Sequence, residues 1–412
     1  MLLDSLGSQF YMPLLFADSH DGQIHCGARL TTRGPFTKNS GDCRSTETEL
    51  LLGDELCDRV GRPLRILHVV NSFAFQNTAQ LKIVGVVLDG LDPERFRCDV
   101  ISTHPGDDLI EELRSRSPRC KFLDWQRGIE QPGKAIAVLS YLRSNHIDIV
   151  HQHILSRSLP WIARLASCKT ILHLHGGIDE GTGRELSFKS PHQFDAVLAT
   201  SDWVGQRARA PIVRTVYPSV QLDEAERDYR ASEEFIFGTA ARLEPVKNIS
   251  LLIRAFAKLA KTDPSVRLQI AGDGAEFGAL AELTRALGVE ENVQFLGWRM
   301  DLRRVLSNWH CFVLPSLSEG FGLAALEAMA AGLPVIASCV GGLRELIADR
   351  SNGLHVAPNN VDELTAAMKE LRTHPELCET LGRAARRRAA DFSAQRQVDV
   401  IEEVYRALAC HH

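Results

Sequence analysis

One stretch of sequence decides the fold of this chain, Ser318-Glu-Gly-Phe-Gly-Leu-Ala-Ala-Leu-Glu-Ala-Met-Ala-Ala-Gly-Leu-Pro334. It follows the apolar run Cys311–Leu314, which is typical of a buried parallel strand. Gly320 and Gly322 allow the backbone to turn tightly and to approach a ligand closely. The Ala- and Leu-rich helix that follows presents free N–H groups and a partial positive charge at its start. This order of strand, glycine loop and helix predicts a phosphate-binding turn of an α/β fold.

Two glutamates, Glu319 and Glu327, stand on either side of the glycine loop. Glu327 lies about one turn into the expected helix, where a carboxylate can accept hydrogen bonds from both hydroxyls of a ribose diol. The alternative is that Glu327 is an ordinary helix residue and that the glycines form a plain turn. The bracketing of the loop by two carboxylates favours the ligand-binding interpretation.

Strands and helices alternate on both sides of this stretch, and a charged segment, Asp223–Arg230, interrupts the alternation. Repeated strand–helix units predict an α/β protein with two Rossmann-like, doubly wound parallel-sheet domains facing a central cleft. We expect a disordered leader (1–62), an N-terminal domain (63–217), a C-terminal domain (232–390) and a C-terminal helix packing back toward the N-terminal domain (391–412). The strands expected are Leu64–Val70, Cys98–Ser102, Ile147–His151, Thr170–His175, Ala196–Thr200, Phe235–Thr239, Arg267–Ala271, Val293–Leu296, Cys311–Leu314 and Pro334–Ala337.

The composition argues against several classes of protein. The 412 residues hold 47 Lys and Arg against 52 Asp and Glu, a formal net charge of −5 that gives no support for nucleic acid as a partner. No apolar run reaches the roughly 18 residues that span a bilayer. Ten cysteines without CxxC spacing are typical of free thiols in a reducing compartment. We therefore expect a cytoplasmic protein. The basic run 386–388 is interpreted as a solvated helix face, with contact to an anionic membrane or to a partner as the alternative.

A second group of candidate residues follows the first strand of the C-terminal domain, in Gly238-Thr-Ala-Ala-Arg-Leu-Glu-Pro-Val-Lys-Asn248. Lys247 comes where the next helix begins, and a cation there is unfavourable by roughly 0.3–1 kcal/mol. A bound diphosphate makes both Arg242 and Lys247 favourable, because Arg suits bidentate phosphate contacts and Lys acts as a point charge. Asn248 is a plausible N-cap. The alternative is a surface pair of cations without a ligand.

These motifs resemble those of the family-4 retaining glycosyltransferases of GT-B fold, the glycosyl transferases group 1. The resemblance is strong over residues 235–405 and loose over 64–220. It implies an enzyme that moves a sugar from a nucleotide-diphosphate donor to the hydroxyl of a carbohydrate or glycolipid acceptor, with retention of configuration and without metal or cofactor. Besides the Arg…Lys pair and the loop with two glutamates, it rests on Ala271-Gly-Asp-Gly274, Phe295-Leu-Gly297, Gly341-Gly342 with Glu345, and Asn352-Gly-Leu354.

The resemblance implies roles for individual residues. Arg242 and Lys247 match residues that bind the donor diphosphate, Glu327 matches the residue that binds the ribose, and the Gly297 loop borders the base. Glu319 and the neighbouring backbone would hold the donor sugar and phosphate, and His175 resembles the family's histidine near the donor sugar. The expected catalytic residues are Glu319, His175, Arg242 and Lys247, and the expected donor-binding residues are Arg242, Lys247, Gly297, Glu319, Gly320, Phe321, Gly322, Leu323 and Glu327.

The N-terminal half departs from the family pattern after its first strand. Family members usually carry a Gly-Gly loop there, whereas this chain has Asn71-Ser-Phe-Ala-Phe-Gln-Asn77. Either Asn71, Ser72 and neighbouring amides substitute for the glycines, or the donor and acceptor geometry differs. Asp179 is a further acceptor-side candidate, with a solvated loop carboxylate as the alternative.

Two His-x-His pairs, His151/His153 and His173/His175, end neighbouring strands of the N-terminal domain. Side chains two residues apart on a strand share one face, so each pair resembles a metal site. We favour the other interpretation, in which these are strand-end residues lining the cleft, some of them held by hydrogen bonds. His151 is then an acceptor-side candidate, and no metal is expected.

Two other classes of function stay open. A nucleotide-sugar epimerase or a phosphorylase can use the same GT-B architecture. A non-catalytic sugar-nucleotide-binding protein is the second alternative, motivated by the missing Gly-Gly loop.

Overall fold

The computed structural model describes residues 62–70, 78–102, 108–124, 132–156, 158–176, 193–222, 227, 229 and 234–410. The expected leader, apart from its last residue, lies outside these ranges, as does most of the charged segment 223–230. The described cysteines, seven in all, are free thiols.

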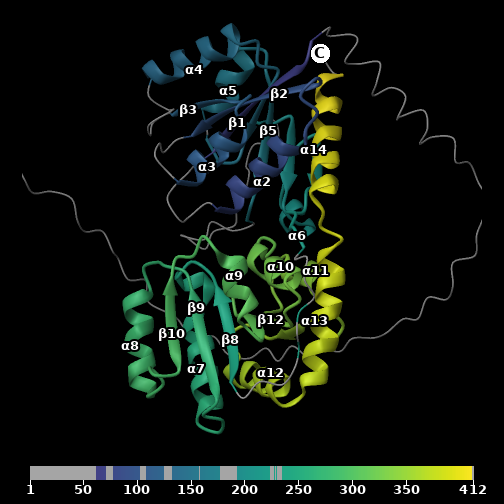
Figure 1. Ribbon diagram of the computed structural model, residues 1–412. Helices are drawn as coiled ribbons and strands as arrows, with labels where there is room; N and C mark the ends of the chain where they lie inside the picture. The colour runs from purple at the N-terminus through teal and green to yellow at the C-terminus, as the bar shows by residue number, and fades with distance from the viewer. Residues whose placement is uncertain are drawn as a thin grey trace, which may run out of the picture. The chain divides into compact units, whose positions relative to one another are not determined.

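Two parallel sheets organise the described chain (Figure 1). The first sheet has the strand order β3-β2-β1-β4-β5-β6-β7, and the second has β10-β9-β8-β11-β12-β13. These orders confirm the predicted pair of Rossmann-like, doubly wound sheets. The direction of winding reverses between β1 and β4 in the first sheet and between β8 and β11 in the second. Ligands of such sheets bind outside the carboxyl ends of the strands at these points.

The strands are β1 (Leu64–Val70), β2 (Phe96–Ser102), β3 (Lys121–Asp124), β4 (Ile149–Gln152), β5 (Lys169–Leu174), β6 (Ala196–Ala199), β7 (Ile212–Thr215), β8 (Phe235–Ala240), β9 (Val266–Ala271), β10 (Val293–Gly297), β11 (Cys311–Leu314), β12 (Val335–Ser338) and β13 (Leu354–Val356).

The helices are α2 (Thr78–Gly90), α3 (Asp108–Arg116), α4 (Pro132–Ser144), α5 (Leu159–Leu165), α6 (Asp202–Gly205), the 3₁₀-helix η1 (Pro245–Lys247), α7 (Ile249–Ala260), α8 (Phe277–Leu287), α9 (Leu302–Ser307), α10 (Leu323–Ala330), α11 (Leu343–Leu346), α12 (Val361–Thr373), α13 (Pro375–Ala389) and α14 (Ala394–Ala409).

Helices cover both faces of the second sheet, which explains why its central strands are apolar throughout. On one face, β8 and β11 pack against α7 and α12 through residues such as Phe237 and Leu252. On the other face, Trp309 and Phe312 pack against α10 and α13. Gly238 lies under the Trp309 ring, and a Cβ at that position would come within 1.9 Å of the indole. The second sheet is therefore a rigid support for the loops at its carboxyl edge.

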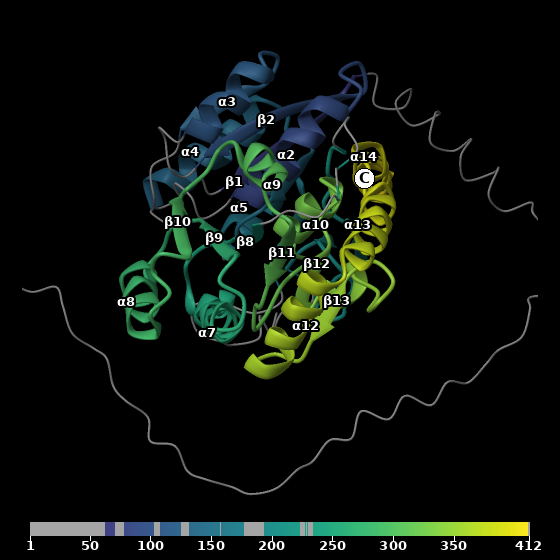
Figure 2. The same ribbon diagram turned by 60° about the horizontal axis from the view of Figure 1, so that its bottom comes forward.

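The last helix, α14, packs against the first sheet although α13 before it belongs to the second (Figures 1 and 2). Its apolar stripe of Val398, Ile401, Val404 and Leu408 joins the cluster built from β1, β4 and β5. The stripe has the spacing of an amphipathic helix that buries one face. The Gln397 side chain also accepts a hydrogen bond from the Ser219 N–H at 2.8 Å. Helix α14 is therefore fixed on the first sheet, although it follows the second sheet in the sequence.

Candidate functional site

A cavity of about 1400 Å³ lies at the carboxyl ends of strands from both sheets. Its lining includes Leu174 at the end of β5, Ala240 at the end of β8, Ala271 at the end of β9 and Leu314 at the end of β11. Pockets for one small ligand usually measure about 300–1,000 Å³. The cavity therefore has room for two ligands, and it stands at the place that the topology predicts.

Lys247 and Glu319 form an ion pair in the wall of this cavity. The Lys247 Nζ donates to Glu319 Oε1 at 2.8 Å, and both side chains are only about a tenth exposed. The Ser316 hydroxyl donates to the same oxygen at 2.8 Å. A buried carboxylate needs such partners, because an unpaired charge in this environment is strongly destabilising. The pair places a cation and an anion side by side, the lysine at the end of η1 and the glutamate in the loop between β11 and α10.

Arg242 follows β8 and also lines the cavity. Its guanidinium donates to Glu244 Oε1 at 2.7 Å, and its side chain is a quarter exposed, so it can reach a ligand. Asn248 occupies the expected N-cap position of α7, but its side chain does not cap the helix. Asn248 has a left-handed backbone (φ 52°) and makes no side-chain capping bond. Its Oδ1 accepts from the Ser250 hydroxyl at 3.4 Å, and its amide group donates to Asn359.

The glycine loop approaches the first sheet closely. A Cβ on Gly320 would lie 2.2 Å from the His175 carbonyl oxygen, so only glycine fits there. The Ser201 hydroxyl, from the start of α6, donates to the Gly320 carbonyl at 2.6 Å. Gly322 has φ 95°, and α10 begins directly after it at Leu323. The mouth of α10, with its unbonded first-turn N–H groups, therefore lines the cavity.

Glu327 lines the cavity one turn into α10 and pairs with Lys82 of α2. No motif in the sequence indicated Lys82 as a site residue. The available signal was its place in the helix that follows β1, since such helices border the carboxyl edge of a doubly wound sheet. The Glu327 side chain is 18% exposed, and Lys82 is half exposed. A ligand that uses the Glu327 carboxylate must share it with Lys82 or displace Lys82.

Gly297 ends β10 with φ 65° but is not part of the cavity lining. The next two residues, Trp298 and Arg299, do line it. The loop expected to border a base therefore reaches the cavity through side chains that the sequence analysis did not name. Phe321, also an expected site residue, lines the cavity and packs its ring against Tyr217 at 5.4 Å between ring centroids.

His175 lies at the cavity, directly after β5, and belongs to a stack of five imidazoles with His68, His151, His153 and His173. The His153 Nδ1 and His175 Nε2 atoms are 3.2 Å apart. Burial lowers the pKa of both His68 and His175 to about 3. The other three imidazoles also have pKa values well below the ordinary value, first because of burial and then because of neighbouring imidazoles. The stack is therefore neutral at physiological pH.

The expected place of His151 in the cavity wall is wrong. Its side chain is fully buried and is not part of the cavity lining, and its Nδ1 is 2.7 Å from the Tyr405 hydroxyl of α14. Its neighbours His153 and His173 do line the cavity, as expected. The remaining acceptor-side candidates, Asn71, Ser72 and Asp179, lie outside the described residues.

Comparison with known proteins identifies the family. Residues 223–388 match the family described as Glycosyl transferases group 1. A D-inositol 3-phosphate glycosyltransferase of Mycobacterium avium is 31% identical over 299 residues, which cover 63% of this chain and 70% of that protein. The chain belongs to the group 1 glycosyltransferases.

Further similarities of this group 1 glycosyltransferase agree with that assignment. A D-inositol 3-phosphate glycosyltransferase of Saccharomonospora viridis is 29% identical over 337 residues, or 70% of this chain and 78% of the relative. The solved structure of Anabaena HepE in complex with UDP-glucose has a TM-score of 0.69 and 20% identity, covering 84% of this chain and all of that one. This structural likeness confirms the GT-B fold. Among the described residues, no helix is long and apolar enough to span a membrane.

Proposed function

We propose that this glycosyltransferase moves a hexosyl group from a nucleotide-diphosphate sugar to an acceptor hydroxyl, with retention of configuration and without a metal ion in the transfer step. One observation carries the proposal: Arg242, Lys247, Glu319, Glu327 and the mouth of α10 all line the same cavity. Two cations and a helix N-terminus suit a diphosphate. A carboxylate one turn into the helix suits the ribose diol.

The charges in the cavity wall fit a dianionic linkage. Lys247 is held by Glu319, and Arg242 by Glu244, so both cations are oriented before a ligand arrives. Oriented donors that need not reorganise are typically worth about a hundred- to a thousand-fold in rate when charge develops on the leaving group. In this proposal Arg242 and Lys247 stabilise the departing diphosphate, which is why no divalent ion is needed.

The transfer step balances without a further reactant. The bond between the anomeric carbon and the diphosphate oxygen breaks, and the diphosphate takes the electron pair. The acceptor oxygen bonds to the same face of the anomeric carbon, and its proton passes to an oxygen of the leaving phosphate. Glu319 and His175 contact the sugar in this proposal, with His175 acting as a neutral hydrogen-bonding group because its pKa is about 3. Closure of the cavity around the ligands would exclude water and limit hydrolysis of the donor.

The relatives suggest which ligands to test first. HepE is solved with UDP-glucose, and the curated relatives named above act on D-inositol 3-phosphate. We therefore place UDP-glucose first among donors and a phosphorylated polyol first among acceptors, followed by other carbohydrates and glycolipids. The cavity volume is consistent with a donor and an acceptor bound together.

A donor screen and two variants test the proposal. UDP-, GDP- and ADP-sugars are compared by thermal shift, because a donor that binds the native state at a hundred times its Kd stabilises it by about 2.7 kcal/mol. Glu327→Gln and Arg242→Ala should each abolish most transfer, while Arg267→Ala, a surface arginine paired with Glu234, should not. The anomeric configuration of the product is read by NMR. Normal turnover in both site variants, or donor conversion without an acceptor, would contradict the proposal.

A further inference from the structure

The five stacked histidines come from three neighbouring strands of the first sheet. His68 of β1 and His151 of β4 are direct partners in the strand register, and His153 follows two residues later on the same face. His173 and His175 continue the stack at the end of β5. All of them except His175 are at least 98% buried. So many buried imidazoles in one place are costly unless their nitrogens have partners.

Ring nitrogens of His68, His151 and His153 lie close together. The His68 Nδ1 and His153 Nε2 atoms are 3.2 Å apart, and ligand atoms of the three residues lie within 4.8 Å of one another. Two imidazole nitrogens bound to one tetrahedral Zn²⁺ at about 2.0–2.1 Å are separated by a little over 3 Å. The Nε2 of His151 is buried and has no hydrogen-bond partner. One pair of nitrogens therefore has the spacing of two zinc ligands, and a nitrogen of His151 lies near enough to join them.

The other nitrogen of each of these three imidazoles is held from outside. The Tyr405 hydroxyl lies 2.7 Å from His151 Nδ1 and 3.5 Å from His68 Nε2. The His153 Nδ1 lies 3.2 Å from His175 Nε2. Histidine ligands of metals almost always have such a partner on the second nitrogen, which fixes the tautomer and the orientation of the ring. Tyr405 belongs to α14, so the supporting group comes from the last helix of the chain.

We propose that His68, His151 and His153 bind a divalent first-row transition ion, Zn²⁺ by the nature of the ligands, with Tyr405 and His175 as the supporting partners of the bound imidazoles. Three imidazoles suit Zn²⁺ and leave one tetrahedral position for water. His153 lines the cavity, which gives an ion a path to the ligands. The three proposed ligands are different residues from Arg242 and Lys247, the proposed contacts of the donor diphosphate.

The ion would have a consequence for His175. Binding through Nε2 leaves His153 with its proton on Nδ1, which then donates to His175 Nε2 across the observed 3.2 Å. The His175 proton must then lie on Nδ1. The metal would therefore set the tautomer of the histidine that borders the cavity, without touching the donor itself.

Metal content of the full chain tests the proposal directly. The protein is stripped with a chelator, dialysed, and supplied with Zn²⁺ alone or Co²⁺ alone. A variant lacking His411 and His412 is used throughout, so that the histidine pair at the end of the sequence cannot contribute. We expect one Zn²⁺ per chain, a raised thermal midpoint, and the intense visible absorption of tetrahedral Co²⁺. His151→Gln should abolish these signals, and His374→Gln, an exposed histidine outside the stack, should not.

Tyr405→Phe keeps the ring and removes only the hydroxyl that supports two of the ligands. It should weaken Zn²⁺ binding by about ten- to a hundred-fold, the usual effect of losing an outer partner. This variant decides the question if His151→Gln fails to fold by circular dichroism. The proposal is overturned if the stripped protein takes up less than one equivalent, or if Zn²⁺ affinity is the same in Tyr405→Phe as in the parent. Neither readout depends on sugar transfer, so failure here leaves the proposed function untouched.

Discussion

At the scale of single residues, the Lys247–Glu319 pair is the most consequential contact in the cavity wall. Both side chains are about nine-tenths buried and only 2.8 Å apart. Removing one partner of a buried pair typically costs about 3–5 kcal/mol, whereas replacing both with neutral groups of similar size is much less costly. Lys247→Met should therefore lower the free energy of unfolding by about that amount, and Lys247→Met/Glu319→Gln by clearly less.

Urea unfolding of the full chain measures both effects. Lys258→Met serves as the control, because its pair with Asp362 is exposed and should be worth less than about 1 kcal/mol. If the double variant is at least as unstable as the single variant, the cost of Lys247→Met does not come from leaving the Glu319 carboxylate unpaired.

Lys82 is a second residue of interest, because it forms an ion pair with Glu327, the carboxylate proposed to bind the ribose. Its pair with Glu327 is half exposed on the lysine side, so it is worth about 1 kcal/mol or less. A donor that needs Glu327 must displace this lysine. Lys82→Met should therefore lower the donor KM by roughly two- to five-fold with little change in kcat. Lys369→Met, on an exposed face of α12, is the matched control. A raised KM would show instead that Lys82 itself binds the donor.

At the scale of elements, the loop between β11 and α10 depends on a side chain being absent. A methyl group on Gly320 would lie 2.2 Å from the His175 carbonyl, so Gly320→Ala must push the loop away from β5. A displacement of about 1 Å at a reacting site can cost roughly a hundred-fold in rate. We expect a loss of that order in kcat/KM. Gly278→Ala on α8, where the new methyl meets nothing within 4 Å, should keep full activity. Equal activity of the two variants would mean that the loop has room to spare.

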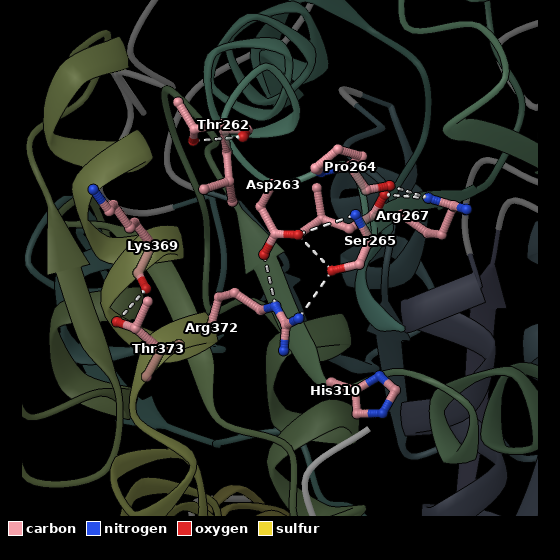
Figure 3. Close-up of polar contacts among 12 residues, drawn as sticks. Thr262, Asp263, Pro264, Ser265, Arg267, His310, Lys369, Arg372 and Thr373 are labelled. Atoms are coloured by element: carbon pink, nitrogen blue, oxygen red, sulfur yellow. Dashed lines mark hydrogen bonds and ion pairs between the residues drawn. The ribbon is translucent and has the colours of Figure 1, made fainter. Parts of the chain in front are cut away.

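His310, which precedes β11 and is hydrogen-bonded to β8, should make the stability of the protein depend on pH. His310 Nδ1 accepts the Ile236 N–H at 3.0 Å, and its pKa lies below the ordinary 6.5 because of burial and of the nearby Arg227 and Arg372, with Glu234 acting weakly in the opposite direction. Figure 3 shows His310 beside the Arg372 guanidinium, which Asp263 holds at 2.9 Å. The native state therefore keeps this imidazole neutral at a pH where the unfolded chain protonates it.

The sign of the pH effect follows from that difference. Below pH 6.5 the unfolded chain binds more protons, so stability falls as the pH drops from 7 toward the native pKa, by at most about 1.4 kcal/mol per pH unit. His310→Asn retains an acceptor near the Nδ1 position and removes the titration. In urea unfolding between pH 7.5 and 5, the wild-type protein should lose stability relative to His310→Asn. Parallel curves for the two proteins would exclude His310 as the source.

At the scale of the whole molecule, the sequence predicted the strands that are formed by continuous apolar segments. Cys311–Leu314 and Leu64–Val70 were placed at their observed bounds, because buried parallel strands are apolar on both faces. The sequence did not reveal β3, β7 and β13, which are short edge strands with polar residues. Edge strands pack against fewer neighbours, so their apolar pattern is weaker.

The same distinction applies to the site. Arg242, Lys247, Glu319 and Glu327 belong to two short segments of one domain, and their types and spacing were informative in the sequence. The contact of Lys82 with Glu327 joins residues 245 positions apart, and no local pattern encodes it. The histidine stack likewise requires the pairing of β1 with β4. Such contacts depend on which strands are neighbours in the sheet. The sequence predicted the fold class but not the order of the strands.

Glu345 joins the two sheets and tests how far the cavity depends on that connection. Its carboxylate, on α11 of the second sheet's segment, accepts the N–H groups of Asp202 and Trp203 at 2.9 and 2.7 Å, and the Tyr217 hydroxyl at 2.9 Å. Asp202 and Trp203 begin α6, so an anion there is also favoured by the helix N-terminus. Hydrogen bonds to a charged group contribute about 1.5–3 kcal/mol each, less where solvent competes.

Removing this carboxylate should therefore affect both stability and donor binding. We expect Glu345→Ala to lower the free energy of unfolding by about 2–4 kcal/mol and to raise the donor KM, since the cavity is lined from both sheets. Glu345→Gln keeps one acceptor oxygen, so its free energy of unfolding and its donor KM should lie between those of Glu345→Ala and those of the wild-type protein. Glu370→Ala, which removes an exposed pair with Arg350, controls for the loss of a surface charge. If Glu345→Ala loses stability but binds the donor normally, the connection serves folding alone, and the second sheet must hold the nucleotide without help from the first.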